Sequence, residues 1–296
     1  MPTTIDSVAA ASAERWRRRS AHTLADAVAR RAIRQAGLVP ADIDLLINAG
    51  LYHDRHLGEP ALAALIQEDI GANPEDPHAG GHGTFSFDVA NGSCGMLAGL
   101  QIADGFLRAG TIRHALIVAS DSRPGRRLAP GFPFGATGAA IVCGWRPEGH
   151  GLQDLRFTEP ATPEATGDPT GGLRATMSFV DGRHRLEIVE TPEFAAAAAA
   201  AAGDLAAKLL ADHGLRPVDV ELVGANPLSD AFLDALATRL GVDRSQMPAP
   251  PGRQAAHTAG LGLALAAAAP DGRLPETTTL LVSAGAGPVA GAALVC

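Results

Sequence analysis

The sequence predicts an α/β protein built from two similar halves, 1–150 and 151–296. Three pairs of segments recur in the same order along the chain: 25–50 resembles 201–226, 114–123 resembles 278–287, and 138–143 resembles 291–296. Strands that alternate with helices in this way indicate largely parallel sheets. We therefore expect two copies of one unit that pack face to face about a pseudo-twofold axis, with a site drawn from equivalent turns of both copies.

The first repeated segment of each half is expected to form an Ala-rich helix that ends at a glycine. Gly37 and Gly214 suit the left-handed backbone that closes a helix, and Pro40 and Pro217 prevent its continuation. The Ala run 195–202 belongs to the second of these helices and is short and flanked by acidic residues. We expect this run to be buried in the protein rather than to cross a membrane.

A strand, a turn and a helix follow one another in the first half. Residues 84–89 alternate apolar and polar side chains, Asn91-Gly92 favours a tight turn, and Gly95–Arg108 has helical apolar spacing. This order places Ser93 and Cys94 at a helix N-terminus. The helix dipole is expected to lower the pKa of a thiol there and to stabilise an oxyanion. The alternative is that Cys94 is only a small buried apolar residue.

The second half offers polar side chains at the equivalent turns. His257 precedes an apolar helix that begins near Leu261, and its spacing to the next strand predicts that it faces Ser93. A neutral imidazole there would accept a proton from a hydroxyl or thiol, although a lone His is often structural. Asn226 ends a repeated strand, where its amide would hold a water or donate to a carbonyl oxygen; as an alternative, it only forms the turn before Pro227.

A glycine loop closes the last strand pair of the second half. Gly285 and Gly287 would let the backbone approach a ligand, but the spacing of a dinucleotide site is missing. His53 with His56, and His78 with His82, are pairs that could suggest a metal. Because no matching Cys or carboxylate set accompanies them, we expect no metal site.

Composition bounds the remaining possibilities. The net charge of −8 argues against nucleic acid as a partner, and the basic run 15–19 is short enough to be a solvated helix face. The three cysteines, at positions 94, 143 and 296, do not form a disulfide framework. The N-terminus has no signal-peptide pattern, and no apolar stretch is long enough to span a membrane. We therefore expect a cytoplasmic protein without a membrane segment.

Three stretches resemble ketoacyl-ACP synthase III and its thiolase-superfamily relatives: FDVANGSCGMLAGLQIADGFLRAGTIRHALIVASD, FPFGATGAAIVCG and SAGAGPVAGAALV. The resemblance implies a thiolase-like five-layer αβαβα fold, a homodimer, and an acyl-enzyme formed at a helix N-terminus. It implies acyl-CoA or acyl carrier protein as the donor, bound as a CoA or phosphopantetheine thioester substrate, and no resident cofactor. It places the activity in fatty-acid-like or natural-product biosynthesis.

The chain departs from the synthase pattern at the site itself. An ungapped match puts Ser93 at the nucleophile position and Cys94, the better nucleophile towards thioesters, one residue later. The synthase His is replaced by the strand end at Asn226, and His257 stands where the synthase has Asn. Trp16 and Arg17 remain as candidates to contact a CoA phosphate.

These departures favour acyl transfer to an O, N or S acceptor, or a non-decarboxylative condensation. The main alternative is a catalytically impaired subunit that supports an active paralogue in a heterodimer. A small-molecule binding protein on the same scaffold is a third, weaker hypothesis.

Overall fold

The structure is a computed structural model that describes residues 2–12, 20–53, 61–72, 83–146, 148–158, 172–250, 255–286 and 289–296. Its strands are β1 (Thr3–Ser12), β2 (Leu45–Asn48), β3 (Phe85–Asp88), β4 (His114–Asp121), β5 (Thr137–Trp145), β6 (Leu152–Phe157), β7 (Leu173–Val180), β8 (Arg183–Glu190), β9 (Leu222–Asn226), β10 (Thr279–Ala284) and β11 (Ala290–Val295). Its α-helices are α1 (Ala21–Gln35), α2 (Leu62–Ile70), α3 (Gly95–Arg108), α5 (Phe194–Asp212), α6 (Asp230–Leu240) and α7 (Gly260–Ala268).

Nine strands form a sheet in the order β3-β2-β4-β5-β1-β6-β11-β10-β9. The first five come from the N-terminal half and the other four from the C-terminal half. The two groups meet at a single residue pair, Thr3 opposite Leu152. Among the described residues of the second half, no strand corresponds to the edge strand β3.

The pairing within each group is mixed, so the expectation of largely parallel sheets is wrong. Strands β2, β3 and β4 are parallel, as are β9 and β10. The pairs β4–β5, β5–β1, β6–β11 and β10–β11 are antiparallel. The link between Ala284 and Ala290 shows the reason, because so short a connection can only join antiparallel neighbours.

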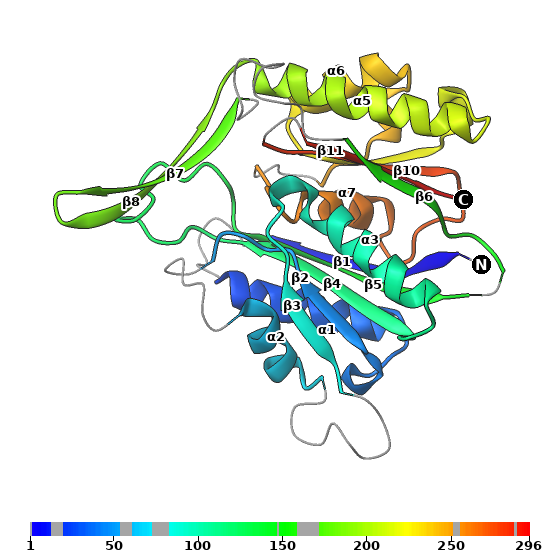
Figure 1. The fold of residues 1–296 in the computed structure, drawn as a ribbon, viewed down its shortest axis with the longest axis horizontal. Helices are drawn as coiled ribbons and strands as arrows, with labels where there is room; N and C mark the ends of the chain where they lie inside the picture. The colour runs from blue at the N-terminus through cyan, green and yellow to red at the C-terminus, as the bar shows by residue number, and fades with distance from the viewer. Residues whose placement is uncertain are drawn as a thin grey trace.

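The helices and strands stack in five layers (Figure 1). Helices α1 and α2 cover the outer face of the first group of strands, and α5 and α6 cover the outer face of the second. Helices α3 and α7 lie between the two groups, where α3 packs on β4 and α7 packs on both β1 and β9. This arrangement confirms the thiolase-like αβαβα fold.

The repeated segments adopt the same local structure in both halves. The chain leaves α1 through Gly37 at φ +76° and leaves α5 through Gly214 at φ +69°, the left-handed region that favours glycine. A short 3₁₀ helix follows in each half, at Pro40–Asp42 and at Pro217–Asp219. The glycines and prolines identified in the sequence therefore end these helices as expected.

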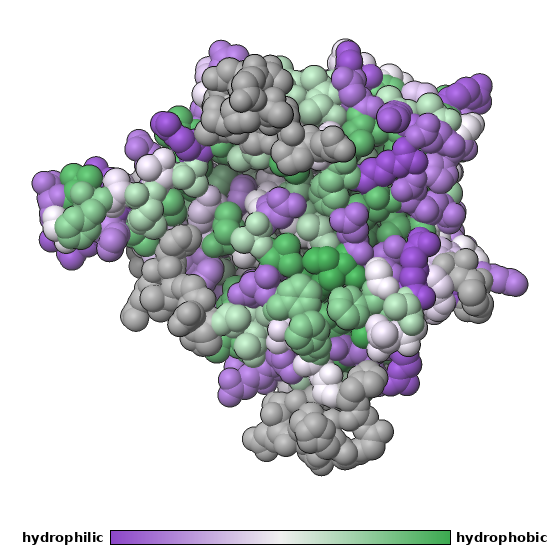
Figure 2. All heavy atoms as spheres, in the orientation of Figure 1, coloured by the Kyte–Doolittle hydropathy of each residue, from purple (hydrophilic) through white to green (hydrophobic). Residues whose placement is uncertain are grey.

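Strands β6, β7 and β8 follow the expected boundary between the halves, and the sequence did not predict them. Strand β6 begins directly after residue 151, and β7 and β8 form an antiparallel hairpin that projects from the body of the protein (Figure 1). Several large apolar side chains on this hairpin are exposed, led by Phe179 at 67% (Figure 2). These strands were not expected from the sequence, because β-propensity depends strongly on context.

Helix α5 is long and apolar enough to cross a membrane by length and composition alone. In this fold it packs instead on β10, β11 and α6. Its apolar face, which includes Phe194, Ala202 and Leu209, is buried in the main core. The expectation that the Ala run lies in a buried helix holds for one face only, because Ala196, Ala197 and Ala200 are exposed.

Candidate active site

The turn after β3 is held by the neighbouring strand and helix. The backbone N–H of Val89 donates to the carbonyl oxygen of Asn48 at 2.8 Å. The carboxylate of Asp88 accepts hydrogen bonds from the backbone N–H groups of Leu62 and Ala63 at the start of α2, at 2.9 and 2.8 Å. Asp88 thus anchors α2 rather than supplying chemistry, and it fixes the direction in which the chain enters the turn.

Ser93 and Cys94 occupy different environments within that turn. Residues Gly92–Cys94 form a 3₁₀ turn that continues directly into α3. Ser93 lines a cavity, whereas Cys94 is fully buried and is not part of the cavity wall. The sulfur of Cys94 lies 3.8 Å from the carbonyl oxygen of Val289.

Burial raises the pKa of the Cys94 thiol to about 12. The expectation of a lowered thiol pKa at this helix N-terminus is therefore wrong. Desolvation in this buried position disfavours the charged thiolate. The environment matches the alternative in which Cys94 is a small buried apolar residue.

The cavity has a volume of about 260 Å³ and opens between the two halves of the fold. Its polar groups come from the turn before α3 and from His257 and Tyr52. Its walls are mainly apolar. They are supplied by the β7–β8 hairpin, the segment between β4 and β5, and the loops that follow β2 and β10: Leu51, Phe134, Leu173, Ala175, Ile188, Gly285, Ala286 and Val289. A polar end with apolar walls suits a ligand that has a reactive head and an apolar chain.

His257 lies in this cavity, held between two aromatic rings. Its ring stacks on Phe134 at a centroid distance of 4.6 Å and lies 5.2 Å from the ring of Tyr52. A methyl group on Gly92 would lie 3.5 Å from Nε2, so this nitrogen faces the turn that carries Ser93. His257 is only 5% exposed.

The residue that corresponds to His257 differs by one from the sequence expectation. The central helices begin at Gly95 and Gly260, which are 165 residues apart (260 − 95). By this measure His257 corresponds to Gly92, not to Ser93. The side chain still reaches the opposite turn because the helix N-termini of both halves meet at the cavity.

Burial lowers the pKa of His257, and the charge of Asp121 opposes this effect. Desolvation is the larger cause, so the imidazole is neutral at pH 7. A neutral ring with one free lone pair is the form that a general base requires.

Asn226 has a different role from the one that the sequence suggested. Its Nδ2 donates to two buried backbone carbonyl oxygens, those of Ser93 and His257, each at 2.8 Å. Both amide hydrogens are thereby used, so none is left for a carbonyl oxygen of a ligand. Asn226 links the turn that carries Ser93 to the turn that carries His257, and the expectation of a ligand-facing amide is corrected.

Asp121 was missed by the sequence analysis and lies at the centre of the site. Its Oδ1 accepts from the backbone N–H groups of Leu51 and Tyr52, at 3.3 and 2.8 Å. Its Oδ2 accepts from the backbone N–H and the hydroxyl of Thr258, at 2.8 and 2.6 Å. Asp121 is fully buried, and it joins the end of β4 to the turn that carries His257.

Of the residues expected from the sequence to contact a ligand, Gly285 lies within the part of the chain that the structure describes. Gly285 lines the cavity, and its N–H donates to the carbonyl oxygen of Val289 at 2.9 Å. Gly287, Trp16 and Arg17 lie outside the described residues. The same holds for His56, His78 and His82 of the metal pairs considered above.

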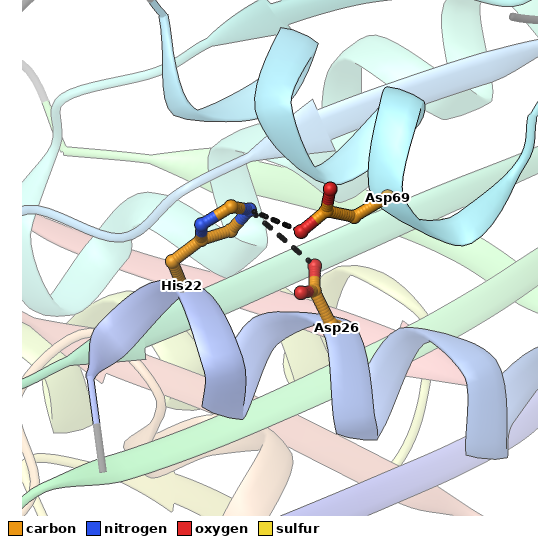
Figure 3. A group of neighbouring side chains, drawn as sticks. All are labelled: His22, Asp26 and Asp69. Atoms are coloured by element: carbon orange, nitrogen blue, oxygen red, sulfur yellow. Dashed lines mark ion pairs between the residues drawn. The ribbon is translucent and has the colours of Figure 1, made fainter.

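A second group of titratable side chains lies away from the cavity, between α1 and α2 (Figure 3). Nε2 of His22 lies 3.7 Å from Oδ1 of Asp26 and 3.3 Å from Oδ2 of Asp69. Their candidate ligand atoms lie within 4.8 Å of one another; His22 and Asp26 are both on α1, and Asp69 is on α2. Burial, with the neighbouring Asp69, raises the pKa of Asp26 to about 6.

The raised pKa makes Asp26 a source of pH-dependent stability. Because the folded protein holds this proton more tightly than the unfolded chain, stability falls as the pH rises from about 4 to 6. We expect Asp26→Asn to raise the free energy of unfolding at pH 7.5 by about 1 kcal/mol after solvent screening, and to lose this gain near pH 4. Urea unfolding at both pH values measures the effect.

A matched control is Asp219→Asn, because hydrogen bonding to Arg216 lowers the pKa of Asp219. This change is expected to reduce stability slightly at pH 7.5, the opposite sign. Equal effects of both substitutions at both pH values would contradict the assignment to Asp26.

Known proteins resemble this chain over most of its length. A β-ketoacyl-acyl-carrier-protein synthase III from Chlorobium luteolum is 28% identical over 272 residues, which cover 88% of this chain and 79% of that protein. Another from Rhodospirillum rubrum is 28% identical over 290 residues, covering 92% and 83%. No family model matches the chain.

Solved structures share the fold from end to end. The 3-oxoacyl-acyl-carrier-protein synthase III of Aquifex aeolicus superimposes with a TM-score of 0.78 at 18% identity, covering 99% of both chains. The priming β-ketosynthase of a polyketide biosynthetic pathway gives a TM-score of 0.77 at 21% identity, covering 99% of this chain and 96% of that one.

The chain is ketoacyl-ACP synthase III-like: it is similar to these synthases in sequence and shares their thiolase-like fold. In this ketoacyl-ACP synthase III-like protein, the turn with Ser93, the imidazole of His257 and the buried Asp121 meet where the two halves face one another. The relatives that it matches over most of its length are named β-ketoacyl-acyl-carrier-protein synthases, which supports a transferase activity.

Proposed function

We propose that this chain is an acyltransferase that forms an acyl-enzyme on the hydroxyl of Ser93. The donor is an acyl thioester of CoA or of acyl carrier protein, and the site of action is the cytoplasm, where these thioesters are made. The observation that supports this proposal is that Ser93 and His257 line one cavity while Cys94 is buried outside it.

Each residue has a role in the proposed reaction. Nε2 of His257 accepts the Ser93 hydroxyl proton as Oγ attacks the thioester carbonyl carbon. The C–S bond then breaks, and the proton passes from His257 to the leaving thiol. The N-terminus of α3 stabilises the negative charge on the carbonyl oxygen during this step. An O, N or S acceptor then attacks the ester and returns the proton to Ser93 through His257.

The cavity walls support an acyl group as the transferred unit. Leu173, Ala175 and Ile188 of the hairpin, with Leu51 and Val289, present apolar surface next to Ser93. Each buried methylene of an acyl chain would contribute about 0.8 kcal/mol to binding. The cavity therefore favours acyl chains that fit its volume of about 260 Å³.

Simple acyl transfer is proposed in preference to decarboxylative condensation. The resemblance implies a Cys-His-Asn set for decarboxylation. Among the described residues that line the cavity, His257 is the only imidazole, and the Asn226 amide is held by backbone carbonyls. A single neutral base is sufficient for transfer from an activated ester.

The proposal is tested by intact-mass measurement after incubation with a series of acyl-CoA and acyl-ACP donors. We expect a mass increase of one acyl group with at least one donor, and its loss when an acceptor alcohol, amine or thiol is added. No adduct with any donor would contradict the proposal and favour the non-catalytic partner subunit.

We also propose a homodimer, as the resemblance implies. The edge strand β3 exposes Phe85 at 58%, and the hairpin exposes Met177 and Phe179 on the face that reaches the cavity near Ala175. Apolar surface of this kind is typical of protein interfaces. Light scattering is expected to give twice the monomer mass, and a monomer at all concentrations tested would contradict this part of the proposal.

A further inference from the structure

The two ring nitrogens of His257 face different groups. Nε2 faces the turn at Gly92, where Ser93 lies, whereas Nδ1 lies 3.9 Å from Oδ2 of Asp121. Within the described part of the chain, Nδ1 is buried and has no hydrogen-bond partner. A buried carboxylate therefore lies close to Nδ1, while Nε2 faces the turn that carries Ser93.

Thr258 competes with His257 for that carboxylate. Oδ2 of Asp121 already accepts from the hydroxyl and the backbone N–H of Thr258, and Oδ1 accepts from two further N–H groups. A carboxylate has about four lone-pair sites, so its acceptor capacity is filled. The Thr258 hydroxyl is the one donor that can rotate away and release a site for Nδ1–H.

We propose, resting on the proposed function, that Asp121 is a positioning residue that keeps the His257 proton on Nδ1, and that the Thr258 hydroxyl limits how closely the two groups approach. With the proton on Nδ1, Nε2 carries the lone pair towards Ser93. The carboxylate also stabilises the imidazolium that forms when Ser93 is deprotonated. Hydrogen bonds of this kind are often long in the free enzyme and shorten in the reacting complex.

Few other groups face His257. Tyr52, which follows β2, lies against the ring, and burial raises its pKa to about 12, so it stays neutral across the working pH range. Phe134 and the turn at Gly92 contribute no titratable group. Among the described residues, Asp121 is thus the charged group that raises the pKa of His257 against the larger effect of burial.

The first test reads the position of the proton without using activity. ¹⁵N-labelled histidine spectra distinguish a protonated ring nitrogen from an unprotonated one, and His257→Gln identifies the resonance of interest among the ten histidines. We expect the Nδ1–H form in the wild type at pH 8 and a mixed or Nε2–H form in Asp121→Asn. An Nε2–H form in the wild type would overturn the proposal, even if acylation is observed.

The second test compares the pH dependence of acylation in two variants. Asp121→Asn is expected to lower the acylation rate by about 10²- to 10⁴-fold and to move its acid limb to lower pH, because the charge that favours imidazolium is lost. Thr258→Val keeps the backbone donor but frees a lone pair of Oδ2, so its acid limb is expected to move to higher pH, with a rate loss below about 10-fold.

The opposite shifts of the acid limb in the two variants distinguish a positioning role of Asp121 from a role in fold stability alone. A variant that only loosens the fold lowers the fraction of active protein and does not move the acid limb. Limbs that stay in place, or that move in the same direction in both variants, would overturn the proposal. If Asp121→Asn does not fold, Thr258→Val and the wild-type spectrum still decide the question. If no acylation is found, the proposed function fails while the tautomer measurement remains valid.

Discussion

Ser93→Ala is expected to abolish acyl-enzyme formation, with a loss of at least about 10³-fold in the rate of adduct formation. The substitution removes the one hydroxyl that lines the cavity at the N-terminus of α3, and it leaves the hydrogen bond from Asn226 to the Ser93 carbonyl oxygen in place. Intact-mass kinetics with the best acyl-CoA donor measure the effect.

Cys94→Ala is the matched control at the next residue. The thiol is fully buried, its pKa is raised to about 12, and it does not line the cavity, so the adduct is expected to form at close to the wild-type rate. An adduct that persists in Ser93→Ala and disappears in Cys94→Ala would make the thiol the nucleophile. It would require the turn at Asn91-Gly92 to rearrange.

Gly260→Ala is expected to destabilise the protein by about 3 kcal/mol or more and to abolish acylation. A methyl group on Gly260 would lie 2.6 Å from Cγ of Asn226 and closer still to its Oδ1. Asn226 would have to move, which would break its hydrogen bonds to the carbonyl oxygens of Ser93 and His257. Denaturant unfolding measures the loss of stability.

Two control experiments test whether the contact with Asn226 causes the loss of stability in Gly260→Ala. Gly105→Ala, at an exposed position within α3 with no atom near the added methyl group, is expected to stabilise the protein by about 0.5–1 kcal/mol. In an Asn226→Ala background, Gly260→Ala is expected to cost less than in the wild type, because the clashing amide is gone. Equal costs in both backgrounds would show that the contact with Asn226 is not the cause.

Local signals were sufficient for much of the fold. Helices α1 and α5 end at glycines followed by prolines, and α3 has clear apolar spacing, so short-range patterns predicted their positions. Strand β1 and the β7–β8 hairpin were missed. Strand β1 lies between β5 and β6, so its stability comes from partners distant in sequence, and the hairpin is set by cross-strand pairing that composition does not reveal.

The site was predictable only where the repeat revealed it. The internal repeat predicted that His257 lies near the turn that carries Ser93, because equivalent helix N-termini face one another. Asp121 has no comparable signal in the sequence, because an aspartate at the end of a strand resembles an ordinary turn residue. Its contacts with Thr258 and His257 are visible only in the folded structure. The role of Asn226 depends on which carbonyl oxygens lie within reach, which sequence alone does not specify.

The central claim is that the Ser93 hydroxyl, activated by His257, carries the acyl group. Its most direct test is peptide mapping of the unmodified wild-type protein after reaction with an acyl-CoA donor, using fragment spectra that separate Ser93 from Cys94. We expect the acyl mass on Ser93, as an oxygen ester. The acyl mass on Cys94, or on any residue outside the turn, would contradict the account.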